Sequence, residues 1–336
     1  MKKLNILAAT SVLGLALTGC GGGSGSETAS SDNGDLQTVT VGHVQLTIFA
    51  PLYVADAKGY FEDAGIDIEL ENIKSGQSAV PLAANGDLDV VAAGFSAGMF
   101  SAIETGLDIS VVGSMGVQPG QDQPSPSALV VSESTSFDSL EDLKGLDIGA
   151  LGGTGGTSAY YISLALAEAG LTMDDVNLVN LGNPDMPSAL KNGSIDAAFI
   201  SAPFWQLAVD NGAENVWTTP KGTSGTGILY GGKFADSDLA QPFFEAMAKG
   251  AQDLQGEERY SDKNLKIIGE YTEQSPEDVA SVPLYTWHPD LHPLPEQLSG
   301  MEDVWMNVDA LDYSEPIPQE NYLNASYAEK VETASK

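Results

Sequence analysis

Residues 85–98 read NGDLDVVAAGFSAG, and residues 192–205 read NGSIDAAFISAPFW, so one pattern recurs 107 positions further along the chain. Each copy has Asn-Gly, an aliphatic residue, an aspartate (Asp89 or Asp196), a short apolar run and a turn rich in serine and alanine. An apolar run bounded by turn residues favours a buried strand. The repeat therefore predicts two similar α/β lobes.

Strand-like and helix-like segments alternate on both sides of these copies. TVTVGHVQ (38–45) is strand-like, APLYVADAKGYFEDAG (50–65) is helix-like, and IDIELENI (66–73) is strand-like again. Such alternation predicts mostly parallel sheets flanked by helices. The Pro-rich stretch QPGQDQPSPS (118–127) separates the two copies. We expect residues 38–125 and 226–336 to form lobe 1, and residues 126–225 to form lobe 2.

The first residues have the features of an export signal. Lys2 and Lys3 precede a 12-residue apolar run (6–17) that is too short to span a bilayer as a helix. The following LTGC, which ends at Cys20, resembles the lipobox of bacterial lipoproteins, and Cys20 is the only cysteine. We expect residues 1–20 to be a lipoprotein signal peptide, residues 21–37 to be a flexible Gly/Ser linker, and the protein to lie outside the cytoplasm on a lipid anchor at Cys20.

The charge of the chain excludes one class of partner. The formal net charge is −33, and removal of residues 1–20 leaves 12 basic and 47 acidic side chains. A surface of this sign repels phosphate backbones and anionic lipid, so we expect no nucleic-acid binding and no membrane contact beyond the anchor. Arg259 is the only arginine.

The motif GFSAG (94–98) matches the G-x-S-x-G elbow that presents a nucleophilic serine in hydrolases. The second copy has Ala202 and Pro203 at the corresponding turn. A hydrolase also needs a histidine base, and both downstream histidines lie in the Pro-rich TWHPDLHPLP (286–295). We expect no enzyme, while an esterase that uses Ser96 stays an alternative. The prolines also disfavour a helix that would align the histidines on a metal, so we expect no metal site.

Several segments together resemble a known family. APLYVADAKGYFEDAGIDIELENIKSGQSAVPLAANGDLDVVAAG (50–94) is similar to substrate-binding proteins of ABC importers in the nitrate, sulfonate and taurine group, and to thiamine-pyrimidine binding proteins and their synthase relatives. SLEDLKGLDIG (139–149), LKNGSIDAAFI (190–200) and PIPQENYLNASYAEKV (316–331) extend the resemblance over most of the chain.

This resemblance implies a two-lobed α/β fold, the periplasmic-binding-protein type II or Venus-flytrap fold, with chain crossings near residues 125 and 226. It also implies an extracytoplasmic receptor that captures a small solute in the cleft between its lobes and delivers it to the permease of an ABC importer. We expect a monomer without a cofactor. The solute is expected to be an anion of the sulfonate, nitrate or taurine kind, and a thiamine-pyrimidine or other flat ring is the alternative.

The stretch GGTGGTS (152–158), before the helix-like AYYISLALAEAG (159–170), is the predicted anion site. Glycines allow backbone N–H groups to approach an anion at a helix N-terminus, and hydroxyls add further donors. No G-K-[ST] follows, which argues against ATP. The resulting candidates in this stretch are Thr154, Gly155, Gly156, Thr157 and Ser158.

Further candidates follow predicted strands, because ligands bind at the carboxyl ends of strands in open parallel sheets. Gln45 and Thr47 would donate hydrogen bonds, and Phe49 would form an apolar wall. The two copies of the repeat would supply facing edges of the cleft, and in the flat-ring alternative the ring lies between Phe95 and Trp205. These candidates are Phe95, Ser96, Pro203, Phe204 and Trp205.

Overall fold

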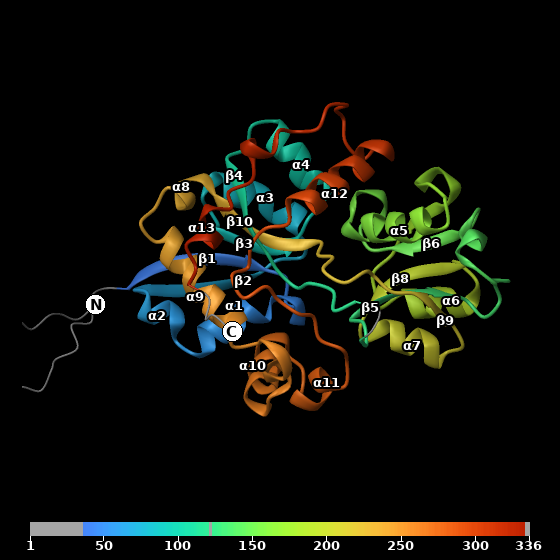
Figure 1. The fold of residues 1–336 in the computed structure, drawn as a ribbon, viewed down its shortest axis with the longest axis horizontal. Helices are drawn as coiled ribbons and strands as arrows, with labels where there is room; N and C mark the ends of the chain where they lie inside the picture. The colour runs from blue at the N-terminus through green and yellow to red at the C-terminus, as the bar shows by residue number, and fades with distance from the viewer. Residues whose placement is uncertain (1–35, 121–122, 333–336) are drawn as a thin grey trace, which may run out of the picture. The chain divides into compact units, whose positions relative to one another are not determined.

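The structure is a computed structural model that describes residues 36–120 and 123–332. They belong to one compact unit, Asp35–Lys336, which contains two five-stranded mixed sheets (Figure 1). The expected signal peptide and Cys20, and all of the linker but residues 36 and 37, lie outside the described residues. In the part of the chain that the structure describes, no helix has the length and apolar character needed to cross a bilayer.

The first sheet has the strand order β2-β1-β3-β10-β4. Strands β1, β2 and β3 are parallel, and β10 is antiparallel to both of its neighbours. The strands are β1 (Gln37–His43), β2 (Ile66–Asn72), β3 (Val90–Gly94), β4 (Ile109–Ser114) and β10 (Thr226–Gly231).

The second sheet repeats this arrangement with the order β7-β6-β8-β5-β9. Strands β6, β7 and β8 are parallel, and β5 is antiparallel to β8. The strands are β5 (Ser127–Val131), β6 (Asp147–Ala150), β7 (Asn177–Asn180), β8 (Ala197–Ser201) and β9 (Glu214–Trp217). The expected two-lobed α/β fold is confirmed, with an antiparallel strand in each mostly parallel sheet.

The sequence repeat corresponds to a structural repeat. The Asp89 carboxylate accepts a hydrogen bond of 2.9 Å from the backbone N–H of Thr40, and Asp196 accepts one of 2.9 Å from the N–H of Asp147. A separation of 107 positions relates β3 to β8, the donor Thr40 to Asp147, and the acceptor Asp89 to Asp196. In both sheets the repeated aspartate therefore connects the start of the third parallel strand to the first.

Apolar residues alternate between the two faces of each strand and so bury both faces of the sheets. One face of the first sheet packs against α1 (Ala50–Ala57), α2 (Tyr60–Asp63), α9 (Ala240–Gln252) and α10 (Asp262–Thr272). Its other face packs against α3 (Gly76–Asn85), α4 (Ala97–Glu104) and α12 (Pro295–Asn307). The single helix expected over 50–65 is divided, because Gly59 takes a left-handed φ of 75°.

The second sheet is covered by α5 (Thr157–Glu168) on one face and by α6 (Met186–Asn192) and α7 (Phe204–Asp210) on the other. The hydrophobic cluster that includes α5 continues into α4 and α12 of the first sheet (Figure 1). The shorter helices are α8 (Gly232–Ala235), α11 (Pro276–Ala280) and α13 (Ser326–Glu329). The chain passes between the sheets after β4 and again before β10, which brings the start of α5 close to the second passage.

Candidate functional site

Three segments meet where β3 ends. Ser96, just after β3, forms an isolated antiparallel bridge with Gly156, just before α5. The Thr157 hydroxyl donates to the carbonyl oxygen of Phe95 at 2.7 Å and lies 3.3 Å from the carbonyl oxygen of Gly225, next to β10. We call this meeting point, formed by Phe95, Ser96, Gly156, Thr157 and Gly225, the junction.

The close approach at the junction requires a residue without a side chain at position 225. A Cβ placed on Gly225 would collide with the Thr157 side chain and would lie 2.8 Å from the Tyr161 hydroxyl. A Cβ on Gly94 would lie 3.4 Å from the Thr157 hydroxyl, which is also tight. Glycine therefore lets the backbone of two strands of the first sheet, β3 and β10, come within reach of Thr157.

Ser96 has a structural role in the helix that follows it. It is the N-cap of α4, and its hydroxyl accepts a hydrogen bond of 3.3 Å from the backbone N–H of Met99. No histidine of the described residues contacts the Ser96 hydroxyl. The strand–turn–helix context of GFSAG is thus present, and its serine satisfies one of the unpaired N–H groups of a helix start.

Ser158 is the second residue of α5, a helix of 12 residues. The residue is buried, with 8% of its surface exposed. Thr154 is exposed, and Gly155 lies beside Ala97, with 3.5 Å between a built Cβ and the Ala97 Cβ. A hydroxyl at the positive end of a helix can donate a hydrogen bond to an anionic oxygen.

Two tyrosines that the sequence analysis missed adjoin the junction. Burial raises the pKa of Tyr161 well above its usual value, and its hydroxyl lies next to Gly225. Burial also raises the pKa of Tyr285 to about 12, and the Tyr285 hydroxyl lies beside Ser201 at the end of β8. Both hydroxyls are protonated at neutral pH, so they can donate hydrogen bonds.

Only one of these tyrosines had a signal in the sequence. Tyr161 follows Thr157 by four positions in a helix, which places both side chains on the same face. Tyr285 lies in a segment without periodicity, and it reaches the site because a glycine, Gly116, leaves room for it. A Cβ on Gly116 would lie 2.9 Å from the Tyr285 ring.

Several expected site residues are occupied elsewhere. The Gln45 amide donates a hydrogen bond of 2.8 Å to the carbonyl oxygen of Tyr271. Thr47 begins a short 3-10 helix (Thr47–Phe49), and Phe49 is fully buried in the core under the first sheet. Phe49 therefore does not form an exposed apolar wall, because α1 and α9 pack around it.

The aromatic sandwich expected between Phe95 and Trp205 is not assembled. The Phe95 ring is buried in the cluster that contains α4 and α12, whereas Trp205 packs half-buried with Phe204 on the cluster of α6 and α7. Pro203 is exposed at the start of α7. Only the backbone of Phe95 faces the junction, because its side chain is part of the core.

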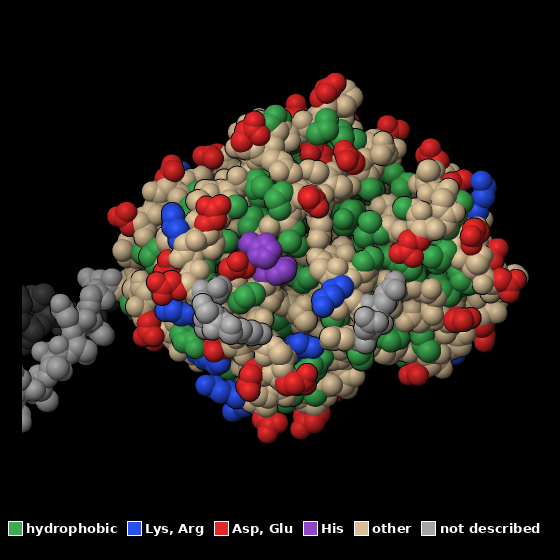
Figure 2. All heavy atoms as spheres, in the orientation of Figure 1, with side chains coloured by type: hydrophobic (Ala, Val, Ile, Leu, Met, Phe, Trp, Pro, Cys, Tyr) green, Lys and Arg blue, Asp and Glu red, His purple; other side chains and the backbone are tan. Residues whose placement is uncertain are grey.

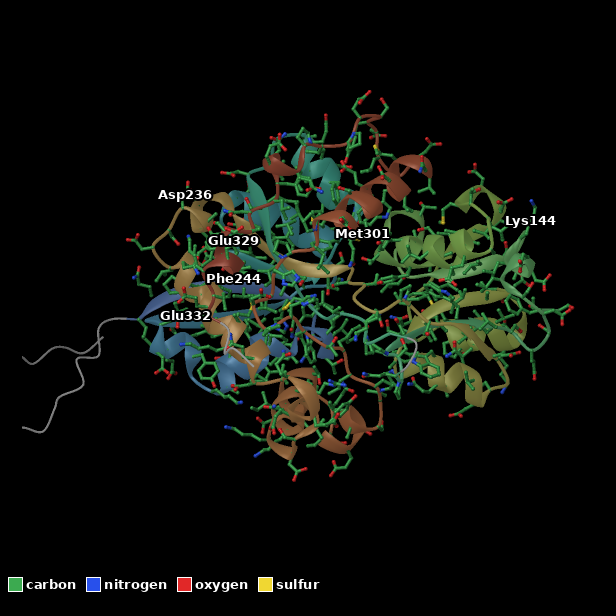
Figure 3. All side chains as sticks on the ribbon, in the orientation of Figure 1. Lys144, Asp236, Phe244, Met301, Glu329 and Glu332 are labelled. Carbon is green, nitrogen blue, oxygen red and sulfur yellow. The ribbon has the colours of Figure 1, made fainter. Side chains whose placement is uncertain are left out.

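Helix α12 contacts the junction through Trp305. The Trp305 indole N–H donates a hydrogen bond of 3.2 Å to the carbonyl oxygen of Gly156. Met301 lies on α12 (labelled in Figure 3). Together with Phe95 it lines a cavity of about 10 Å³, roughly the space of one water molecule. The buried hydroxyl of Thr226, which has no partner among the described residues, also lines this cavity.

His288 and His292 form a surface pair near the C-terminal part of the chain (Figure 2). Their ring centroids are 4.0 Å apart, and Asp290 contacts Nδ1 of His292 at 2.7 Å. Burial lowers the pKa of His288. Across residues 36–120 and 123–332, no three acidic, histidine or cysteine side chains are placed to hold a metal ion.

The architecture, two similar mixed sheets with flanking helices, is that of the periplasmic-binding-protein fold. A solved structure of the alkanesulfonate-binding protein SsuA from Xanthomonas axonopodis pv. citri, bound to MOPS, superposes with a TM-score of 0.60 at 19% identity. The superposition covers 82% of this chain and 94% of that structure. Residues 47–257 match the family described as NMT1/THI5 like, and the chain belongs to this family.

Curated relatives carry different descriptions. A putative aliphatic sulfonates-binding protein of Bacillus subtilis (strain 168) is 30% identical over 212 residues, which are 62% of this chain and 59% of that relative. A 4-amino-5-hydroxymethyl-2-methylpyrimidine phosphate synthase of Aspergillus parasiticus is 27% identical over 150 residues, 44% of this chain and 40% of the relative. The chain thus spans less than two thirds of the length of these relatives.

Proposed function

We propose that the protein is an extracytoplasmic solute-binding receptor of an ABC import system. The observation that carries this proposal is the junction, where Thr157 of α5 reaches the backbone of Phe95 and Gly225 in the first sheet. A hydroxyl that bonds across two lobes changes its partners when the lobes open, so solute binding and lobe closure become linked. The family match and the binding proteins among the relatives support this role.

We propose an anionic solute of the sulfonate, nitrate or taurine kind. The start of α5 offers the Ser158 hydroxyl, the Thr157 hydroxyl and the positive end of the helix dipole, without a charged side chain. In this structure the Phe95 carbonyl oxygen accepts a hydrogen bond from Thr157. A solute oxygen would take over this acceptor position when the lobes open and close again around it.

The flat-ring alternative keeps one observation in its favour. The Tyr161 hydroxyl, beside Gly225, is close enough to Tyr285 to interact with it electrostatically, and aromatic rings can stack on a pyrimidine. These tyrosines replace Phe95 and Trp205 in this hypothesis. The pyrimidine phosphate synthase among the relatives supports it.

Delivery and anchoring complete the proposal. We propose that residues 38–125 with 226–336, and residues 126–225, act as the two lobes that a permease recognises. Cys20 would carry the lipid that holds a monomeric receptor at the cell membrane. The Ser96 esterase has less support, because Ser96 acts as a helix cap and lacks a histidine partner in the described residues.

Native mass spectrometry of the freshly purified protein would identify a co-purified solute, and calorimetric titration with methanesulfonate, taurine, nitrate and an aminopyrimidine would rank the classes. Ser158→Ala should weaken anion binding by roughly ten- to hundredfold, the value of one hydrogen bond to a charged group, and leave the empty protein's melting temperature unchanged. Ser163→Ala is the matched control on α5, since its hydroxyl bonds the Tyr160 carbonyl. Two results would contradict the anion site: equal anion affinity in Ser158→Ala and Ser163→Ala, or tighter binding of the aminopyrimidine than of any anion by the wild type.

A further inference from the structure

Arg259 is a buried cation that forms no ion pair with the residues that the structure describes. It is 9% exposed at the end of a 3-10 helix (Gly256–Tyr260). One terminal nitrogen donates to the carbonyl oxygen of Gly256 at 3.0 Å, and the other lies 3.5 Å from the Gln123 side-chain oxygen. The Nε atom is buried and has no partner among the described residues, and the guanidinium carbon lies 5.0 Å from the Tyr260 ring centroid.

No carboxylate of the described residues pairs with this guanidinium. The ion pairs within residues 36–120 and 123–332 involve Lys58, Lys144, Lys266 and His292. The neighbouring Glu257 and Glu258 are exposed and contribute none. A buried charge without a partner is costly. Because an arginine has five N–H donors and only two hydrogen bonds to described residues are found here, the guanidinium keeps unused donors.

A second cation, Lys221, packs against Gly120, which lies close to Gln123. The backbone N–H of Gln123 donates to the carbonyl oxygen of Gly120 at 3.3 Å, so these two residues are close in space. The Lys221 chain packs on Gly120, since a Cβ built there would lie 3.2 Å from the Lys221 Cα. Lys221 is exposed and makes no ion pair with any described residue. Figure 2 shows how few basic side chains stand among the acidic ones on the face it presents.

We propose that Arg259 and Lys221 form a binding site for a small free oxyanion of the sulfate or phosphate type, separate from the junction. The planar guanidinium presents parallel N–H groups to an oxyanion, and the flexible lysine adds a second positive charge. The bound anion neutralises the buried charge of Arg259. It also joins the Gly256–Tyr260 helix to both chain segments that connect the two sheets, which contain Gln123 and Lys221.

The two anion sites differ in their chemistry. The junction offers neutral hydroxyls and a helix end, whereas Arg259 and Lys221 offer full positive charges. Competition by chloride should therefore weaken sulfate binding at Arg259, and loss of the Ser158 hydroxyl should not affect it. These differences allow the sites to be tested one at a time in the full chain.

The test is thermal unfolding of the full chain in a sodium sulfate titration, with sodium chloride at matched ionic strength as reference. Sulfate stabilises most proteins by exclusion from their surface, whereas a site gives a rise in Tm that follows the linkage relation and depends on occupancy. We expect this specific rise in the wild type and in Ser158→Ala. Compared with the wild type, the same rise in Tm should require a sulfate concentration at least tenfold higher in Arg259→Gln and severalfold higher in Lys221→Gln.

Lys263→Gln is the matched control, because it removes one exposed positive charge close in sequence to Arg259 and should keep the wild-type response. If Arg259→Gln does not fold, the test uses Arg259→Lys and Lys221→Gln instead. Arg259→Lys keeps the positive charge but lacks the parallel N–H groups of the guanidinium. Both variants should need more sulfate than the wild type for the same rise in Tm. An identical sulfate response in all variants would mean exclusion or an adventitious ion only and would overturn the site. Asp122 lies outside the described residues, and a response found only in Asp122→Asn would also overturn the proposal of a free anion.

Discussion

The Thr157 hydroxyl lies 2.7 Å from the carbonyl oxygen of Phe95, and this hydrogen bond joins the start of a helix on the second sheet to the end of a strand in the first. Thr157→Val keeps the shape of the side chain and removes the donor. Since one hydrogen bond contributes about 0.5–1.5 kcal/mol, we expect the free energy of unfolding to fall by about this amount. Urea unfolding measures it, and small-angle scattering should show a larger radius of gyration for the empty protein.

Thr157→Ser is the control for this substitution, because it keeps the hydroxyl and loses only a methyl group. It should retain the scattering profile of the wild type. Equal radii of gyration for Thr157→Val and the wild type, together with equal stability, would show that the bond does not hold the two sheets in this arrangement.

Gly225 and Gly155 form a matched pair of glycines. A Cβ on Gly225 would collide with Thr157 and approach the Tyr161 hydroxyl to 2.8 Å, whereas a Cβ on Gly155 would only touch the Ala97 Cβ at 3.5 Å. Gly225→Ala should therefore destabilise the protein by about 1–3 kcal/mol, the usual cost of overpacking, and weaken solute binding. Gly155→Ala should change both quantities little in thermal unfolding and titration; the reverse order of effects would contradict the packing described at Gly225.

Ser96 is expected to behave as a helix cap. Ser96→Ala removes the acceptor for the Met99 N–H and should cost about 1 kcal/mol in the free energy of unfolding, while Ser96→Asp should recover most of it, because aspartate is also a good cap. Hydrolysis of a p-nitrophenyl ester, measured in parallel, should be no faster than in buffer for all three proteins. A wild-type rate that is abolished in Ser96→Ala would instead support the esterase.

The fold was accessible from the sequence because its signals are local. Apolar runs such as 90–94 and 197–201 coincide with β3 and β8, and the repeated aspartates report a hydrogen bond that recurs in both sheets. The family resemblance and the two-lobed α/β fold are confirmed. The division of the helix over 50–65 was missed, because the pattern of apolar residues continues past Gly59 and gives no sign of its left-handed φ.

The site was less accessible because it depends on tertiary contacts. The sequence predicts Thr157, Ser96 and Gly156 as site residues because they lie next to strand and helix ends, and these positions follow from chain order alone. Phe49 has the same kind of position but packs into the core, and the Gln45 amide bonds Tyr271, more than 200 positions away. No periodicity in the sequence places Tyr285 beside Ser201. The ligand roles of all these residues stay predictions.

Cys20 is proposed to carry the lipid anchor, and it is the only cysteine of the chain. Cys20→Ala should release the protein from the membrane fraction into the soluble extracytoplasmic fraction. The purified, soluble domain of the variant should unfold at the wild-type temperature, because position 20 precedes the compact unit that begins at Asp35. Fractionation followed by immunoblotting measures the distribution, and an unchanged membrane-bound share of the variant would contradict lipid anchoring.

Glu302 is a buried carboxyl on α12, one turn before the Trp305 that bonds Gly156. Burial raises the pKa of Glu302 above its ordinary 4.5, although the Ile317 N–H and the Tyr313 hydroxyl, which donate to it at 2.8 and 2.9 Å, favour the ionised form. Between pH 4.5 and this raised pKa the folded protein holds a proton that the unfolded chain has lost. The free energy of unfolding therefore falls as the pH rises through this window and levels off above it.

Glu302→Gln lacks this titration and keeps an acceptor for the Ile317 N–H. Asp56, whose pKa burial also raises, contributes equally to both proteins, so the difference between wild type and variant isolates Glu302. Urea unfolding of both proteins from pH 4 to pH 8 should show the wild type losing stability relative to Glu302→Gln as the pH rises, with a constant difference at the upper end of the series. A relative gain of wild-type stability with rising pH would mean that the two hydrogen bonds outweigh burial and that the pKa is lowered.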